Sequence, residues 1–500
     1  MHDDEIKRGE TRRAFVKKLA AGAGAALVAP ALIDACRSAA SMQTTAGRAA
    51  GGALGGGAPG AYTGAGWEMV PGILARIKAP VFPDRDFPIT KYGAVGDGVR
   101  DCTDAFRQAI DACVAAGGGR VVVPEGRFLT GAIHLRSNVN LHVVREGTIL
   151  FSTDPMQYLP QVLTRFEGVE LMGYSPLIYA FEQENVAVTG EGTLDGQASS
   201  TYWWPWKGKK DFGWKQGDPK QDDARAKLFQ MAEDNVPPAQ RMFGAGSYLR
   251  PSFIQPYRCR NILIAGITIR NSPMWEIHPV LCQNVTVSGV TIDTLGPNND
   301  GCDPESCRDV LIENTSFNTG DDCIAIKSGR NADGRRIAVP SENIIIRGCR
   351  MQDGHGGVTV GSEISGGARY IFAERCTMSS PNLDRALRLK DNAARGGTLE
   401  HIFMRDCTVG EVGESVLAID FQYEEGPNGK FIPVVRDVEM LRVTSEKSPY
   451  GLYLRGLANA VISDVRILDC TFSNVAKGDV VEYVSGLVRR GFTENGVKVG

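Results

Sequence analysis

One short pattern recurs through the second half of the chain and constrains its fold more than any other feature. Each copy starts with a polar or aromatic residue and continues as two short apolar strands separated by polar or small residues. Copies start at Asn261, Asn284, Asp309, Asn343, Tyr370, His401 and Asp464, with a degenerate copy at Asp437 and plausible earlier ones at Asn138 and Asn185. Intervals of 23 to 34 residues between the first six copies are too short for a strand–helix unit but suit three brief strands with turns. The repeat therefore predicts an all-β chain, a single-stranded right-handed parallel β-helix (solenoid), with coils about 4.8 Å apart.

A second series of short strands lies between the repeat copies and indicates which side chains point outward. It consists of CIAIKS (323–328), GVTVGS (357–362), ALRLKD (386–391), VLAIDF (416–421) and GLYLRG (451–456). In each strand two apolar residues stand at alternate positions, which is the pattern of one face turned toward a core. The residues between them then point outward, so Arg388 and Lys390 are expected side by side on the outer face.

Four short polar patches stand in these strands or just before them. They are Asn298-Asn299-Asp300, Asp321-Asp322, Gly354-His355-Gly356 and Arg388-Leu389-Lys390. Because a solenoid stacks its coils, residues that are far apart in the sequence can line one face. Three carboxylates, one imidazole and two cations on one face suit acid–base hydrolysis of an acidic polysaccharide. The net charge of −3 means that an acidic ligand must be drawn by such local cations, and it argues against a general nucleic-acid surface.

The first 86 residues are expected to be an export signal and a linker. Residues 1–40 resemble a twin-arginine signal, because Arg12-Arg13 precedes an apolar run from Leu19 to Ile33. Residues 41–86 contain a Gly/Ala-rich tract and are expected to form a flexible tether, so that folding begins near Phe87 and residues 87–500 form one domain. This predicts a periplasmic or secreted protein. A weak lipoprotein-like sequence that ends at Cys36 leaves lipid attachment open, and no apolar stretch of the sequence is long enough to span a membrane.

Two segments depart from the repeat. Residues Thr103 to Ala116 have helical periodicity and end in a glycine run, so a helix is expected to cap the open N-terminal end of the β-helix. Residues 197–253 form an insert that is rich in tryptophan and carries the basic cluster Lys207, Lys209 and Lys210. Its aromatic residues predict either a private mini-core or a wall on which sugar rings stack, and the sequence leaves both interpretations open.

Twelve cysteines in a chain with an export signal raise the question of disulfide bonds. Four of them occupy the seventh place of their repeat copies, where other copies hold Ile267, Val290 or Val443. These four are Cys349, Cys376, Cys407 and Cys470. The simplest interpretation is a stack of buried thiols. Cys302 and Cys307 remain candidates for a disulfide, no spacing indicates a zinc site, and neither a metal nor a cofactor is expected.

The four polar patches, taken in order, resemble a known family. NNDGCDPESC, NTGDDCIAIKSG, GHGGVTVGSE and RALRLK are similar in order and spacing to the signatures of glycoside hydrolase family twenty-eight, the polygalacturonases and their relatives. The segment ITKYGAVGDG is similar to the start of bacterial members, and the resemblance covers roughly residues 87–480. It implies a right-handed parallel β-helix and the hydrolysis, with inversion, of α-linked galacturonate or rhamnogalacturonan in pectic polysaccharide.

The resemblance also implies catalytic roles. Asp321 corresponds to the general acid of the family, and Asp300 and Asp322 correspond to the carboxylates that activate water. His355 is similar to the family histidine that tunes the acid. The chemistry needs this division, because one carboxyl must hold a proton for the leaving oxygen while another stays ionised, usually about 6.5–9.5 Å away in inverting enzymes.

The same motifs imply contacts with the substrate. Arg388 and Lys390 are similar to the cations that hold the substrate carboxylate, and an arginine is suited to bidentate contact. Asn298 and Lys327 are expected to bind substrate as well.

One departure from the family pattern concerns the mode of attack. Endo-acting members usually read Asn-Thr-Asp where this chain has Asn298-Asn299-Asp300, and the change is expected to alter the rim of the cleft. Together with the insert, it favours an exo-acting enzyme whose groove is blocked at one end, where Lys207, Lys209 and Lys210 meet the terminal uronate. A rhamnogalacturonan hydrolase of the same family, a calcium-dependent β-helix pectate lyase and a non-catalytic glycan-binding solenoid remain as alternatives. The oligomeric state stays open.

Overall fold

The first residue of every repeat copy has a left-handed backbone conformation. In the computed structural model, which describes residues 66–500, the ten starting residues from Asn138 to Asp464 have φ between 55° and 64°. Asn and Asp tolerate this region better than other side chains, which explains why they open most copies. Their side chains also bond along the stack, since Asn185 donates to Asn138 at 2.9 Å, Asn261 to Asn185 at 3.0 Å and Asn284 to Asn261 at 2.8 Å. The starting residue therefore fixes both the turn and the register of each coil.

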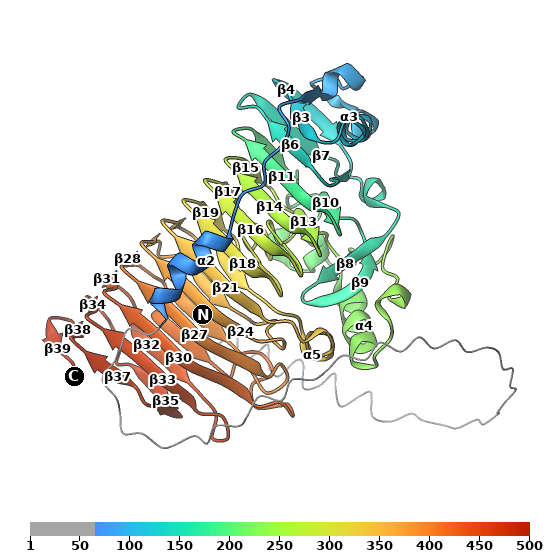
Figure 1. Cartoon of the computed structure of the whole chain (residues 1–500). Coiled ribbons are helices and arrows are strands. Elements are labelled where there is room, and N and C mark those ends of the chain that lie inside the picture. Colours follow the sequence, from blue (N-terminus) through green and yellow to red (C-terminus); the bar gives the residue numbers. More distant parts are fainter. Residues whose placement is uncertain (1–65) are drawn as a thin grey trace, which may run out of the picture. The chain divides into compact units, whose positions relative to one another are not determined.

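Each coil contributes strands to three parallel sheets, so the predicted parallel β-helix is confirmed (Figure 1). The first sheet contains β1 (Asp86–Pro88), β3 (Gly119–Val123), β6 (Val139–Val143), β11 (Glu184–Gly190), β14 (Arg260–Ala265), β16 (Gln283–Ser288), β18 (Arg308–Glu313), β21 (Ser341–Arg347), β24 (Ala368–Glu374), β27 (Gly397–Arg405), β30 (Pro433–Leu441), β33 (Ile462–Leu468), β36 (Val484–Ser485) and β37 (Val488–Arg490). The second sheet contains β2 (Asp97–Asp101), β4 (Gly126–Thr130), β7 (Gly147–Phe151), β12 (Thr193–Asp195), β15 (Thr268–Arg270), β17 (Thr291–Thr294), β19 (Ser316–Thr319), β22 (Arg350–Met351), β25 (Thr377–Met378), β28 (Thr408–Glu411), β31 (Thr444–Lys447), β34 (Thr471–Phe472), β38 (Thr493–Glu494) and β39 (Val497–Lys498).

The third sheet carries the strands of the second sequence series. It begins with β5 (Ile133–His134), β10 (Ile178–Phe181) and β13 (Ile254–Tyr257) and ends with β20 (Ile324–Ile326), β23 (Val358–Val360), β26 (Arg385–Lys390), β29 (Ser415–Asp420), β32 (Tyr450–Arg455) and β35 (Val480–Glu482). Single bridges from Ile254 to Ile277, from Ile277 to Cys302 and from Cys302 to Ile324 join the two parts. Consecutive coils therefore stay in register along this whole face.

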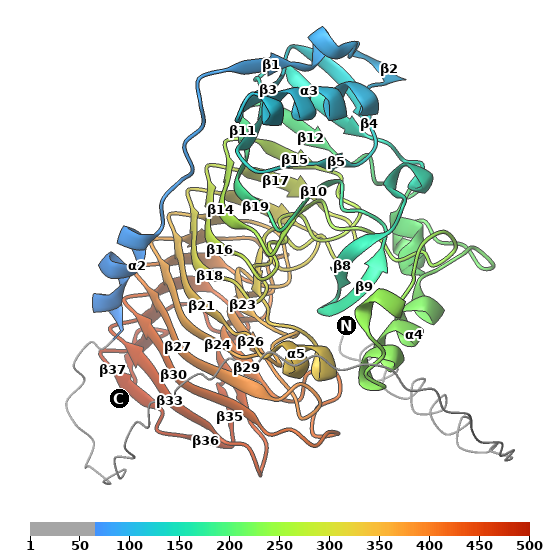
Figure 2. The same cartoon turned by 45° about the vertical axis from the view of Figure 1, so that its right-hand side comes forward.

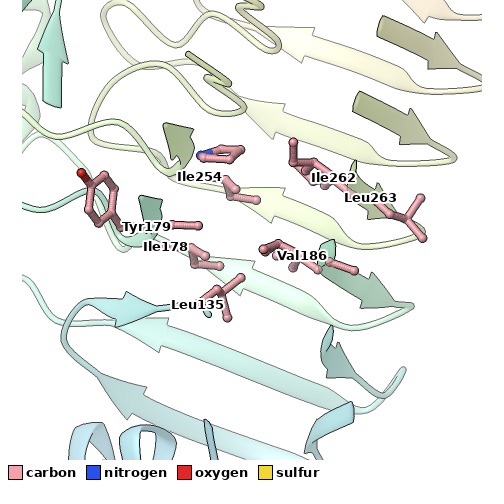
Figure 3. A pocket seen from close by; sticks show the side chains of 12 residues that line it. Leu135, Ile178, Tyr179, Val186, Ile254, Ile262 and Leu263 are labelled. Atoms are coloured by element: carbon pink, nitrogen blue, oxygen red, sulfur yellow. The ribbon is translucent and has the colours of Figure 1, made fainter. Parts of the chain in front are cut away.

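The interior of the coils is filled with apolar side chains. In the N-terminal coils, Leu135, Ile178, Val186 and Ile254 point into the space between the sheets, whereas Tyr179 points away from it (Figure 3). The cavity left between these side chains has a volume of about 10 Å³, which is hardly enough for one water molecule. A ligand site is therefore expected on the outer surface of the coils.

The cysteines belong to this interior. The eleven cysteines in the described part of the chain are all free and buried, so the predicted stack of Cys349, Cys376, Cys407 and Cys470 is confirmed. The alternative of a disulfide between Cys302 and Cys307 is wrong. Both side chains are fully buried, and burial raises the pKa of the Cys302 thiol well above its usual range, so Cys302 behaves as a small apolar side chain.

A helix caps the N-terminal end, as predicted. Helix α3 (Thr103–Ala115) buries Ala105, Phe106, Ala109 and Ile110 against the first coil. Figures 1 and 2 show it across the end of the stack beside β3. The short 3-10 helices η2 (Ile89–Tyr92) and η3 (Pro155–Tyr158) lie nearby in the sequence.

Folded structure begins before Phe87, where the sequence predicted that it would start. The export signal (1–40), with Cys36, and the tract up to residue 65 lie outside the described residues, but η1 (Trp67–Met69) and α2 (Val70–Arg76) are folded. Trp67 is buried against Phe372 and Phe403, with ring centroids 5.4 and 6.3 Å away, and Arg76 pairs with Asp309 at 2.7 Å. The expectation that folding begins near Phe87 is therefore wrong, because this short apolar segment packs against apolar side chains on the outer face of the first sheet, beside which Figure 2 shows α2.

Three further segments project from the coils on the side of the third sheet. They are the antiparallel hairpin β8 (Val162–Phe166) and β9 (Val169–Gly173), the insert with η4 (Trp204–Lys207), η5 (Lys210–Phe212), α4 (Asp222–Glu233) and η6 (Pro238–Gln240), and helix α5 (Asn331–Ile337). In the insert, Trp203 is buried and contacts Tyr158 and Trp206 edge to face. Trp203 belongs to the apolar core of the coils, and Trp204 and Trp206 pack against that core, so these three tryptophans do not form a private mini-core. None of the helices in the described part of the chain is long and apolar enough to cross a membrane.

Candidate active site

The four polar patches converge on consecutive coils of the third sheet. Asp300 precedes the bridge at Cys302, Asp321 and Asp322 precede β20, His355 precedes β23, and Arg388 and Lys390 lie on β26. Pairing of Cys302 with Ile324, Ile324 with Val358 and Val358 with Leu387 puts these coils side by side. All predicted catalytic residues therefore share one site.

The three aspartates form a tight cluster at this site. One oxygen of each of Asp300, Asp321 and Asp322 lies within 4.8 Å of the other two. Asp322 is fully buried, Asp300 is 3 % exposed, and the side chain of Asp321 is 20 % exposed. Of the three carboxylates, Asp321 is thus the one that reaches the cleft, where an acid must meet the leaving oxygen.

Asp322 is held in its ionised form by two cations. Lys390 Nζ donates to Asp322 Oδ2 at 2.6 Å, Thr359 Oγ1 donates to Oδ1 at 2.9 Å, and Arg388 Nη1 lies 3.5 Å from Oδ1. Burial opposes ionisation, but the charges of Lys390 and Arg388 outweigh it and lower the pKa of Asp322. Asp322 is therefore suited to act as a base.

Asp321 and His355 form a second pair. Their Oδ1 and Nδ1 atoms are 3.1 Å apart, and the histidine side chain is 54 % exposed. The charge of Asp321 and its hydrogen bond raise the pKa of His355 to about 9, so the imidazole is protonated at neutral pH. Burial would raise the pKa of Asp321, but the charge and hydrogen bond of His355 lower it. The pair as a whole carries one transferable proton beside the cleft.

The pKa of Asp300 is shifted in the opposite direction to that of Asp322. Burial and the charges of Asp321 and Asp303 raise the pKa of Asp300 well above its usual range. These surroundings favour the protonated form of Asp300. The structure thus separates two residues that the sequence left equal, because the cations beside Asp322 favour its ionised form.

Lys327 lies beneath the aspartates instead of in the cleft. Its ammonium is 3.6 Å from Asp300 Oδ2, 3.6 Å from Asp303 Oδ1 and 3.1 Å from Glu363 Oε2, and its side chain is 3 % exposed. The prediction that Lys327 contacts substrate is therefore wrong, because the ammonium compensates the buried carboxylates of the floor.

Asn298 and Asn299 have different roles. Asn298 Oδ1 accepts from Lys207 Nζ at 2.7 Å and from Arg250 Nη2 at 2.8 Å. Asn299 is fully buried, and its amide donates to the carbonyls of Ser272 and Met274, both at 3.0 Å. Asn299, the residue that departs from Asn-Thr-Asp, therefore ties this turn to the preceding coil.

Several residues of the site were missed in the sequence. Thr359 binds Asp322, and Asp303, Glu276 and Glu363 are buried acids near the cluster. Alignment of the strands provides a signal for one of them, because Thr359 pairs with Arg388 in the same outward row. Glu276 has no comparable signal, and burial together with the charge of Asp300 raises its pKa well above its usual range.

One side of the cluster is enclosed by the projecting segments. The carbonyl of Gly168 at the tip of the β8–β9 hairpin accepts from Arg330 N at 3.1 Å, and Arg225 of α4 donates to Glu167 at 2.8 Å. Gly168 has φ of 80°, and a Cβ there would lie 2.8 Å from Arg330 N, so this approach requires glycine. Figures 1 and 2 both show β8, β9, α4 and α5 grouped beside the third sheet.

Comparison with known proteins agrees with this geometry. Residues 244–485 match Glycosyl hydrolases family 28. A solved exopolygalacturonase from Thermotoga maritima is 48 % identical, with 87 % of this chain and 97 % of that chain covered and a TM-score of 0.85. An exo-poly-alpha-D-galacturonosidase of Dickeya chrysanthemi is 26 % identical over 78 % of this chain and 63 % of its own length, and a probable polygalacturonase of Vitis vinifera is 28 % identical over 79 % and 76 %. The chain therefore belongs to glycosyl hydrolases family 28.

Proposed function

We propose that this protein hydrolyses α-linked galacturonate bonds of pectic polysaccharide from one chain end, with inversion at the anomeric carbon. The observation that carries the proposal is the cluster of Asp300, Asp321 and Asp322, which holds one ionised base, one exposed carboxylate and cations on one face. The 48 % identity to an exopolygalacturonase over most of both chains supports the substrate and the exo mode.

The proton inventory of the cluster suits this chemistry. His355, which is protonated and 3.1 Å from Asp321, passes its proton to Asp321 as Asp321 donates a proton to the leaving oxygen. The pair thereby delivers its one proton, and His355 stays neutral until it takes up a proton from solvent. Asp322 accepts a proton from the attacking water, while the neutral Asp300 orients that water. Clustered carboxyls favour such a division, because each charge raises the pKa of its neighbours.

The carboxylates lie closer together than is usual for an inverting hydrolase. Oxygens within 4.8 Å of one another are closer than the about 6.5–9.5 Å that usually separates acid and base in inverting hydrolases, and the spacing by itself favours retention. Burial favours inversion, because the nucleophile of a retaining enzyme must bond to the anomeric carbon. Asp322 does not reach the cleft surface, and both of its oxygens are engaged by Thr359 and Lys390. It can act only through water.

Proton NMR of a fresh digest of trigalacturonate tests the stereochemistry. Inversion releases the β-anomer first, and the α-anomer appears later by mutarotation. An initial α-anomer would show that an aspartate attacks directly. Chromatography of digests of homogalacturonan and rhamnogalacturonan tests the polymer, and release of galacturonate or digalacturonate from the first alone is expected. Products from rhamnogalacturonan alone would contradict the substrate.

We also propose that the protein is exported and works in the periplasm or outside the cell. The support is the twin-arginine-like segment with Arg12 and Arg13, and a pectic polymer is too large to reach an enzyme inside the cell. Replacement of both arginines by lysine is expected to leave the protein in the cytoplasmic fraction. Unchanged export would contradict the proposal, and mass spectrometry of the mature N-terminus would decide lipid attachment at Cys36.

A further inference from the structure

Most cations around the aspartates are paired with carboxylates, but Lys207 is an exception. Lys390 pairs with Asp322, and Lys327 pairs with Asp300, Asp303 and Glu363. Lys207 donates to the neutral amide oxygen of Asn298 at 2.7 Å, and within the described residues its ammonium forms no ion pair with a carboxylate. It is only partly buried, so a ligand can reach it.

A second cation faces the same amide oxygen. Arg250 is buried and donates to Asn298 Oδ1 at 2.8 Å, to the carbonyls of Pro273 and Pro297 at 2.8 and 2.7 Å, and to Gln221 at 3.3 Å. These acceptors are all neutral. Two positive charges thus converge on one neutral oxygen. Glu167 acts electrostatically on both cations and Asp321 acts on Arg250, but neither carboxylate forms an ion pair with Lys207, so the ammonium keeps capacity for a further anion.

The lowered pKa of Lys207 indicates that the charge of its ammonium is incompletely compensated. Burial lowers its pKa to about 8, the charge of Glu167 opposes this effect, and the positive charges of Arg250, Arg225 and Lys209 lower the pKa further. A carboxylate bound at this ammonium would restore the lost stabilisation of its charge.

The position of this group relative to the aspartates identifies the sugar that it would meet. Asn298 lies two residues before Asp300, on the side enclosed by the insert and the β8–β9 hairpin. Arg388 and Lys390 lie three strands further along the third sheet, on β26. We propose that Lys207 and the amide of Asn298 bind the carboxylate of the galacturonate whose anomeric carbon reacts, which is the terminal sugar where single galacturonates are released. This inference rests on the proposed function, and Arg250 acts as a positioning residue for Asn298.

Two aryl glycosides isolate this contact. The 4-nitrophenyl α-D-galacturonide and α-D-galactoside differ only in the carboxylate of the reacting sugar, and neither carries a second uronate for Arg388 and Lys390. Lys207→Met is expected to lower kcat/KM on the galacturonide about 10- to 100-fold, the range for loss of one charge-assisted hydrogen bond, and to leave the galactoside unchanged. Lys207→Arg keeps the charge and should retain the preference for the galacturonide. If aryl turnover is too slow to measure, the same comparison is made with both glycosides as competitive inhibitors of trigalacturonate hydrolysis.

Lys215→Met is the matched control, because Lys215 is an exposed lysine of the same insert. Equal losses on both glycosides, or no loss on either, would overturn the subsite. Digests with the wild-type enzyme test the proposed function independently of the subsite. If the wild-type enzyme trims polygalacturonate and Lys207→Met has no effect, the proposed subsite is contradicted but the proposed function stands. If the wild-type enzyme is inactive on polygalacturonate, both the proposed function and the subsite are contradicted.

Discussion

The ammonium of Lys390 lies 2.6 Å from the carboxylate of Asp322, and both side chains are almost completely buried. The sequence suggests that Lys390 holds the substrate carboxylate, beside Arg388. The structure gives it a different primary partner, since it keeps the catalytic base ionised. Arg388, with a side chain 12 % exposed and 3.5 Å from Asp322, remains better placed to contact a substrate.

Lys390→Met should therefore mainly lower stability, whereas Arg388→Met should mainly weaken substrate binding. Loss of Lys390 leaves a buried carboxylate uncompensated, and we expect the free energy of unfolding to fall by about 3–5 kcal/mol. Loss of Arg388 should weaken uronate substrates more than their methyl esters, with a smaller effect on stability. Denaturant unfolding and kcat/KM on polygalacturonate and methyl-esterified pectin measure the two effects. Equal destabilisation by both substitutions would contradict the assignment.

The three aspartates should not contribute equally. Asp321→Asn and Asp322→Asn remove the acid and the ionised base, and each is expected to lower kcat on the order of 10²–10⁴-fold. The surroundings of Asp300 favour its protonated form, so Asp300→Asn keeps a hydrogen-bonding group of similar shape and should lose at least about tenfold less activity. Asp293→Asn is the control, because Asp293 is exposed on β17 of the second sheet. Circular dichroism verifies the fold, and a larger loss for Asp300→Asn than for Asp322→Asn would reverse the ranking.

His355 should titrate well above a free histidine. Its pKa is raised from 6.5 to about 9 by Asp321, so the contribution of the pair to stability is complete below pH 6.5 and is lost as the pH rises through about 9. NMR titration of histidine-labelled protein measures this pKa directly. Asp321→Asn is expected to return it toward 6.5, whereas an unchanged pKa in that variant would show that Asp321 is not the cause.

The fold was largely predictable from the sequence because the repeat is periodic and its first residue has a conformational requirement. Asn261 and Asn284 signal the left-handed corner directly, and the alternation in ALRLKD gives the inward face of β26. The segment around Trp67 was not predictable in the same way. It is short, follows a low-complexity tract, and folds against Phe372 and Phe403, which only the finished coil stack brings together.

The sequence predicted which residues form the site, but it predicted less well which partners their side chains contact. Motif spacing brought Asp300, Asp321, Asp322 and His355 together, because each occupies the same corner of its coil. Whether a cation meets substrate or a buried carboxylate depends on depth below the surface, which sequence spacing does not contain. Lys327 was misjudged for this reason. The sequence named Lys207 only together with Lys209 and Lys210, and the local fold of the insert, which follows no repeat, shows that Lys207 is the one that contacts Asn298.

A time course on polygalacturonate tests the central claim most directly, with viscosity and reducing ends followed in the same digest. The enclosed side of the aspartate cluster predicts that galacturonate or digalacturonate appears from the first minutes while the viscosity of the polymer falls slowly. A rapid fall in viscosity, with oligomers of intermediate length appearing before small sugars, would contradict attack from the chain end.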